Sequence, residues 1–97
     1  MFAGDEPAPE PIDPAIQVRL NDMRQAGRSC GAQEATKAII ALGDRVTRDQ
    51  GNVWINRVID QRCDALWGIG ASNTETEAWQ LACRTTFLAK IRRVLVD

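Results

Sequence analysis

The sequence predicts an all-α fold: a small bundle of three to four helices built on a C-terminal antiparallel helical hairpin, with an extended N-terminal arm. Apolar residues recur at the three- and four-residue spacing of amphipathic helices, and no segment alternates apolar and polar residues as a strand would. We expect the arm over residues 1–13 and a helical domain over residues 14–97. The expected helices cover residues 14–26, 32–49, 53–67 and 75–96.

The first segment, residues 1–12, reads MFAGDEPAPEPI and contains three prolines and three acids. Proline lacks a backbone donor and favours extended geometry in the residue before it, so this segment is an arm rather than a packed element. It is either a disordered tail or a segment that becomes ordered against a partner. Residues 1–14 contain four acids and no basic residue, which leaves a balance of +3 in the remaining 83 residues. An acidic arm of one copy could therefore lie on the basic body of another.

The first helix is expected to begin at Asp13-Pro14, because aspartate caps free amides and proline suits the first helical position. It should end at Gly27, since glycine commonly terminates helices. Its apolar stripe consists of Ile16, Leu20 and Met23.

The second helix has an apolar stripe of Ala35, Ala38, Ile39, Leu42 and Val46. Gly43 lies within it and either weakens the helix, by about 1 kcal/mol relative to alanine, or marks a close helix crossing. At residues 49–52 the chain either breaks or continues through a weak point. We expect a break there, with Asn52 capping the next helix.

The last two helices form the expected hairpin. The third places Ile55, Ile59 and Leu66 on one side. The fourth, the longest, carries leucines every seven residues, at Leu81, Leu88 and Leu95, with Ile91 between the last two and with Phe87 and Val94 alongside. This stripe is wide enough to face more than one neighbouring helix.

The segment between these two helices contains Gly68 and Gly70, followed by Ser72-Asn73-Thr74. A glycine-rich turn before a helix can bind phosphate, but Glu75 and Glu77 would repel an anion at this helix start, and no lysine follows the glycines. The S-x-x-E and T-x-x-E patterns favour helix caps instead. We therefore interpret this segment as the bend of a hairpin.

The candidate partner-binding residues are Trp54, Trp67, Trp79, Arg92 and Arg93. The tryptophans either close the ends of the core or anchor a partner, since tryptophan often dominates interfaces. The arginines either complement the dipole of the last helix or make a weak contact with nucleic acid. If the hairpin folds near residue 70, Trp79 lies near the level of Cys63.

No catalytic constellation is evident. The chain has no histidine, and Cys30, Cys63 and Cys83 form no CxxC pair, so we expect reduced thiols without a base to activate them. Asp60 and Asp64 share a helix face and could hold a cation, but pairing with neighbouring arginines is the simpler interpretation. We therefore expect no enzymatic activity, no cofactor and no bound metal.

Length and charge limit the function further. A domain of 97 residues buries a modest core, which favours oligomerisation or docking. A net charge of -1 argues against general nucleic-acid binding. No apolar run is long enough to span a membrane, and the acidic N-terminus is unlike a signal peptide.

Residues 48–95 combine three features: Trp54 opens one helix, a polar turn with acids follows over residues 70–77, and Ile91-Arg92-Arg93-Val94-Leu95 ends the second helix. This pattern resembles small helical-hairpin proteins of tailed bacteriophages. The resemblance implies a non-catalytic structural or assembly component, such as a capsid, neck or internal protein, in the virion or the host cytoplasm. Its partners would be protein subunits of a homo-oligomer or of a larger viral assembly. The alternative is a small regulatory binder of a host protein or a nucleic-acid-associated factor.

Overall fold

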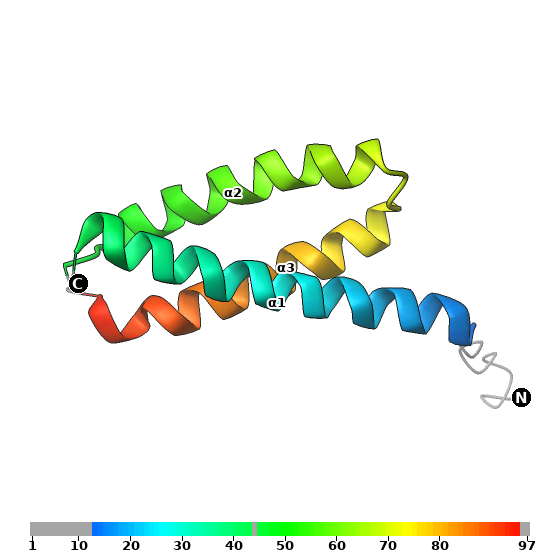
Figure 1. Ribbon diagram of the computed structural model, residues 1–97, viewed down its shortest axis with the longest axis horizontal. Helices are drawn as coiled ribbons and strands as arrows, with labels where there is room; N and C mark the ends of the chain where they lie inside the picture. The colour runs from blue at the N-terminus through cyan, green and yellow to red at the C-terminus, as the bar shows by residue number, and fades with distance from the viewer. Residues whose placement is uncertain (1–12, 44, 96–97) are drawn as a thin grey trace, which may run out of the picture.

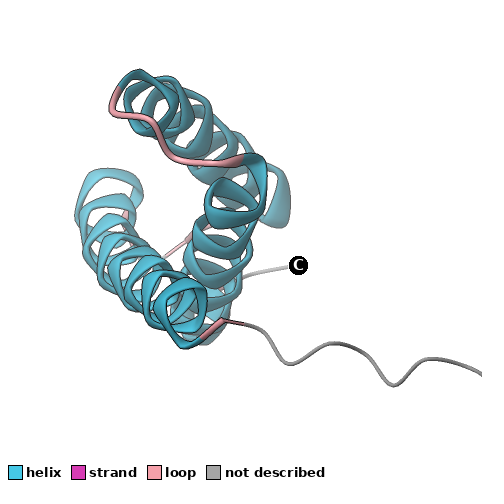
Figure 2. Cartoon of the chain, turned by 90° about the vertical axis from the view of Figure 1, so that its right-hand side faces the viewer, coloured by secondary structure: helices cyan, strands magenta, loops and turns pink. Residues whose placement is uncertain are grey.

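The computed structural model describes residues 13–43 and 45–95, so the arm predicted over residues 1–13 lies outside the described part except for Asp13. The described chain forms α1 (Pro14–Leu42), α2 (Arg48–Gly68) and α3 (Asn73–Ile91), followed by a short 3-10 helix, η2 (Arg92–Val94) (Figures 1 and 2). One isolated parallel bridge joins Val46 to Leu95 beside the end of η2. The predicted all-α class is confirmed, with three α-helices in the described residues where the sequence suggested four.

Helix α1 begins as expected and ends later than expected. The Asp13 carboxylate accepts a hydrogen bond from the Ala15 amide at 2.9 Å, and Pro14 occupies the first helical position. The predicted stop at Gly27 is wrong, because α1 continues without a break to Leu42. Gly43, with φ of 79°, follows as the terminating residue.

Two buried glycines explain why α1 continues. A Cβ on Gly27 would lie 3.1 Å from the Ala82 Cβ and would collide with the Trp79 carbonyl oxygen. One turn later, a Cβ on Gly31 would lie 3.1 Å from the Phe87 amide nitrogen and would collide with a carbonyl oxygen of α3. Both glycines therefore serve a close helix crossing. The sequence suggested this role for Gly43, which has nothing near it.

Helix α2 begins before the predicted break. Thr47 is the N-cap, and its side chain accepts a hydrogen bond from the Gln50 amide while the Gln50 side chain accepts one from the Thr47 amide. The break predicted at residues 49–52 is wrong, and Asn52 is an exposed residue within the helix rather than its cap. Gly51 is buried there, where a Cβ would lie 2.6 Å from Cδ1 of Ile91.

The arrangement of the helices differs from a simple C-terminal hairpin. Helices α2 and α3 run in opposite directions and are joined by a short bend that lies apart from the first turns of α1 (Figures 1 and 2). The closest backbone approach is between α1 and α3, which run in the same direction, because Gly27 faces Trp79 and Gly31 faces Cys83. A bundle built on the α2–α3 hairpin is therefore not confirmed.

The core uses Phe87 and Ile91 of the predicted stripe of α3, but it follows a line that is rotated away from Leu81. Its buried members are Trp79, Cys83, Phe87 and Ile91, one residue per helical turn. Successive helix residues are about 100° apart, so Leu81 lies about 160° away from Trp79, on the far side of the helix. It is 70% exposed, and the prediction that it belongs to the core is wrong. The other core members are Ala35 and Ala38 of α1 and Ile55, Ile59 and Cys63 of α2.

The molecule is extended for its length. Its Cα radius of gyration is 17.3 Å, whereas a compact domain of about 100 residues has a value near 13 Å. None of the helices in the described residues combines the length and the apolar character that crossing a bilayer requires. Much helix surface is therefore left without an intramolecular partner.

Candidate partner-binding surfaces

The bend between α2 and α3 is closed by its own hydrogen bonds. Gly70 has φ of 92°, which suits glycine, and Ser72 caps α3. The Ser72 hydroxyl accepts a hydrogen bond from the Glu75 amide at 3.1 Å, and the Glu75 carboxylate accepts one from the Ser72 amide at 2.9 Å. The hydrogen bond from the Ser72 amide to the carboxylate is the main cause of the lowered pKa of Glu75, and the Ser72 side chain adds to it. The carboxylate of Glu75 itself therefore occupies the start of α3, as the S-x-x-E pattern predicted.

The tryptophans at this end of the molecule have different environments. Trp79 is 4% exposed and belongs to the core. It lies near the level of Cys63, because Nε2 of the adjacent Gln80 donates a hydrogen bond to the Cys63 Sγ at 2.8 Å. Trp67 is 50% exposed, and Ile69, which the sequence did not single out, is 82% exposed. We call Leu66, Trp67 and Ile69 the bend patch. Leu66 and Ile69 also line a hollow of about 290 Å³ that reaches Cys30 and Trp79.

Trp54 is held by the molecule itself. Its Nε1 donates a hydrogen bond to Oε1 of Glu34 at 3.1 Å, and the other Glu34 oxygen pairs with Lys37 at 3.2 Å. Glu34 is 7% exposed, so this network satisfies a buried carboxylate and ties α2 to α1. The structure therefore gives half-buried Trp54 a role within the chain.

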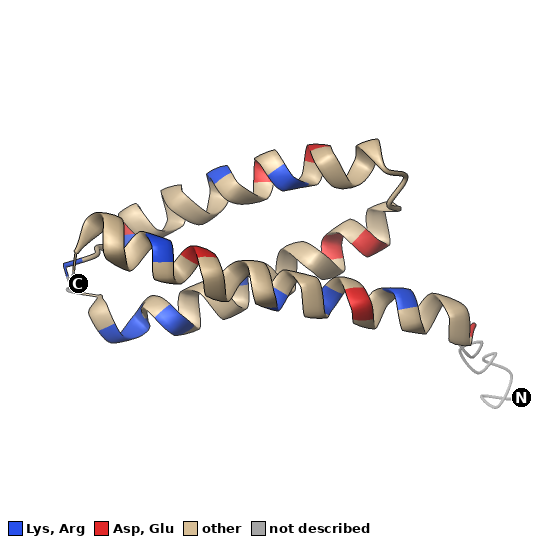
Figure 3. Ribbon diagram, viewed as in Figure 1, with Lys and Arg blue, Asp and Glu red and all other residues tan. Residues whose placement is uncertain are grey.

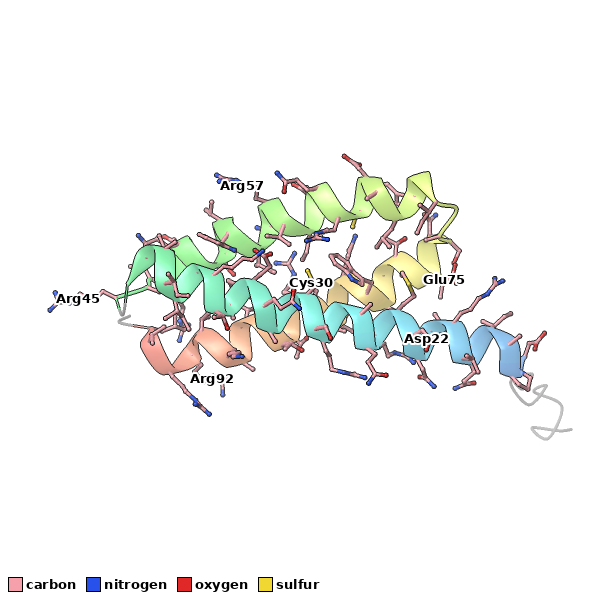
Figure 4. All side chains as sticks on the ribbon, viewed as in Figure 1. Asp22, Cys30, Arg45, Arg57, Glu75 and Arg92 are labelled. Carbon is pink, nitrogen blue, oxygen red and sulfur yellow. The ribbon has the colours of Figure 1, made fainter. Side chains whose placement is uncertain are left out.

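The two candidate arginines belong to different surfaces. Arg92 and Arg93 are both exposed in η2, and Arg92 projects away from the bundle (Figure 4). Arg92 lines a hollow with Asn52 of α2 and Leu88 of α3. Arg93 instead lines a hollow on α3 that includes Thr86 and Lys90. They do not form a single basic cluster.

A groove between α1 and α3 is the surface that sequence reasoning missed. A hollow of about 420 Å³ is lined by Leu20, Arg24 and Arg28 of α1 and by Leu81 of α3. It shares Thr85 and Thr86 with the hollow of about 440 Å³ that contains Lys90 and Arg93. We call these two adjoining hollows the α1–α3 groove. The four-residue spacing of Trp79, Cys83, Phe87 and Ile91 could have placed Leu81 on this outer side.

The three cysteines are free thiols near the centre of the molecule. Burial raises the pKa of the Cys83 thiol to about 12, and the neighbouring Cys30 thiol adds to the increase. Cys83 is thus protonated, and a poor nucleophile, at neutral pH. Asp60 and Asp64 are exposed, and no group of three metal-ligating side chains occurs in residues 13–43 and 45–95.

We expect the raised pKa of Cys83 to make the folded state sensitive to alkali. The unfolded thiol ionises near its ordinary pKa of 9.0, whereas the folded thiol stays protonated to about pH 12. The stabilisation that results from this difference in pKa is fully present below pH 9 and is lost between pH 9 and 12. Urea denaturation at pH 8 and pH 10.5 in reducing buffer measures the loss. Cys83→Ala should lose less stability than the wild type between the two pH values; an equal loss would contradict the assignment.

Comparisons of the chain with protein-family models, with curated proteins and with solved structures found no match. The two candidate surfaces, the bend patch and the α1–α3 groove, are therefore identified only from the exposure and charge of the residues that form them.

Proposed function

We propose that the protein is a non-catalytic structural or assembly component, in particular a small virion protein of a tailed bacteriophage. It would act by docking its helices onto other protein subunits. The observation that carries this proposal is the bend patch, where half of the Trp67 surface and most of the Ile69 surface are exposed beside the buried Trp79. Large apolar side chains gathered at one exposed place are typical of protein interfaces.

The shape of the molecule supports the same role. Its radius of gyration of 17.3 Å exceeds the value of about 13 Å for a compact domain of similar length. A small chain with this much uncovered helix surface gains stability when a neighbouring subunit covers it. An assembly component has such neighbours.

Incorporation into particles tests the proposal. The full chain is produced together with the other proteins of its virion, and the particles are separated from free protein by density-gradient sedimentation. We expect the wild type to sediment with the particles, and the double variant Trp67→Ser, Ile69→Ser to remain mainly in the free fraction. The control is the double variant Ile40→Ser, Val53→Ser, which also removes two exposed apolar side chains, 78% and 57% exposed, and should still sediment with the particles.

The contrary outcomes are also clear. A wild-type chain found only as free protein would contradict the assembly role. If the bend-patch variant is incorporated as well as the wild type, the bend patch is not the docking surface. Circular dichroism of each variant shows whether its helices are intact.

A further inference from the structure

The α1–α3 groove combines an apolar floor with unpaired positive charge. Leu81, 70% exposed, lies in the groove together with the half-buried Ala78 and Ala82. Arg24, Arg28, Lys90 and Arg93 line it. In the described residues, no carboxylate is within ion-pair distance of these four cations. Glu77 is the one acid that lines the groove there, at the start of α3. Figure 3 shows the basic positions toward the end of α3 and the acidic positions at its start.

The chain carries a segment whose chemistry complements this groove. Residues 1–12 contain Asp5, Glu6 and Glu10, three prolines and no basic residue, together with apolar residues such as Phe2. A proline-rich segment favours the polyproline II conformation, which docks on grooves at low entropic cost. Twelve residues in that conformation measure about 37 Å. The α3 side of the groove, from Thr74 to Arg93, measures about 29 Å, so the arm is long enough to follow it.

We propose that the α1–α3 groove binds the acidic arm, residues 1–12, of a second copy of the chain. The acids of the arm pair with the arginines and the lysine of the groove, and its apolar residues cover Leu81. This inference rests on the assembly role proposed above, and it names one of the contacts from which the assembly is built.

The length of the arm favours a second copy over the same chain. Since α1 and α3 run in parallel with Gly31 facing Cys83, Lys90 lies near the level of Ala38. That level is about 36 Å along α1 from Pro14. Asp5, eight residues before Asp13, reaches at most about 28 Å from it when fully extended. The backbone of a chain's own arm therefore reaches the levels of Arg24 and Arg28 but stops short of those of Lys90 and Arg93, whereas the arm of a second copy can meet all four cations.

Peptide binding tests the groove directly. The body, residues 13–97, is used once circular dichroism shows that its helices form without the arm; otherwise the full chain takes its place. A fluorescent peptide of residues 1–13 is titrated with this body, and binding is followed by fluorescence anisotropy at low salt. We expect Arg28→Glu with Lys90→Glu to weaken binding at least about tenfold, and Leu81→Ser at least about fivefold.

A matched control separates a local contact from general charge attraction. Arg45→Glu with Arg57→Glu makes the same change in net charge outside the groove, at side chains that project away from it (Figure 4). This control should leave the dissociation constant within about twofold of the unmodified body. Equal weakening by the two double variants, or no binding by the unmodified body, would overturn the proposal.

Self-association of the full chain tests the second copy. Sedimentation equilibrium is measured on the full chain carrying Trp67→Ser and Ile69→Ser, so that the bend patch does not contribute. We expect association that is lost with Arg24→Glu, Arg28→Glu and Lys90→Glu. It should return when Asp5, Glu6 and Glu10 are also changed to lysine. A monomer at every concentration, or association that the groove variant leaves unchanged, contradicts the proposal.

Three further outcomes are distinguishable. A groove that binds double-stranded DNA more tightly than the arm peptide would be a nucleic-acid site, and the proposal would be wrong. If the groove variants lose peptide binding and self-association but wild-type protein never sediments with particles, the assembly role fails while the arm contact stands. If particles incorporate the wild type but its arm peptide does not bind, only the arm contact fails.

Discussion

Gly31→Ala is expected to destabilise the protein by about 2–3 kcal/mol, although alanine is the better helix former. The added methyl group would meet the Cys83 carbonyl oxygen and would lie 3.1 Å from the Phe87 amide nitrogen. Both neighbours are backbone atoms of α3, which cannot move without separating the two helices. Gly27→Ala should behave in the same way, because its methyl group meets the Trp79 carbonyl oxygen.

Gly68→Ala is the matched control for this prediction. Gly68 also lies in a helix, but nothing is within 4 Å of an added Cβ, and its φ is not positive. The substitution then changes only the helix propensity, which is higher for alanine than for glycine. The free energy of unfolding should therefore stay unchanged or rise by up to about 1 kcal/mol. Gly27 and Gly31 of α1 and Gly68 at the end of α2 should therefore respond to alanine with opposite signs.

Thermal and urea denaturation followed by circular dichroism measure these differences. Because the chain is small, a loss of 2 kcal/mol should lower Tm by about 8–16 °C. All variants are compared at one protein concentration, since self-association would raise the apparent stability. A Gly31→Ala protein as stable as the wild type would show that the close crossing of α1 and α3 is absent.

Phe87→Ala is expected to cost about 3–5 kcal/mol, a large effect for a single truncation. Phe87 is fully buried at the centre of the stripe that α3 presents to the other helices. Its removal leaves a cavity lined by packed side chains that can close only partly. The unfolding transition should move to much lower urea concentration with little change in slope.

Leu81→Ala supplies the comparison, because Leu81 is 70% exposed on the same helix. Its effect on the free energy of unfolding should stay within about 0.5 kcal/mol. Equal losses for Phe87→Ala and Leu81→Ala would mean that the seven-residue leucine stripe forms the core after all. The structure would then be wrong about the rotation of α3.

Local signals placed the helix starts well where the residues involved are neighbours in sequence. The Asp13-Pro14 start and the Ser72–Glu75 cap depend on side chains that reach amides only two or three positions away. The signal of the Thr47–Gln50 cap of α2 is equally local, but the break expected at residues 49–52 placed the start of this helix at Asn52 instead. These errors moved helix boundaries but not the fold class.

The candidate surfaces were predictable only in part. Of the tryptophans, Trp67 is exposed, Trp79 is core and Trp54 is bonded to Glu34, although all three look alike in the sequence. The groove was missed, since Leu81 fits a seven-residue leucine stripe as well as the side of the helix opposite Trp79, Cys83, Phe87 and Ile91. The exposure of an amphipathic residue depends on the rotation of its helix, which only the neighbouring helices set.

The sequence by itself determined the helical class, the helix start at Asp13 and the bend at Gly70, because periodicity and capping act within a few residues. Only the tertiary structure decided that α1 passes through Gly27 and Gly31, that α3 packs closely on α1, and that Leu81 faces outward. A glycine ends a helix where no neighbour covers it and permits a close crossing where one does. The residue is the same in both cases, so the distinction lies in contacts between segments about 52 residues apart.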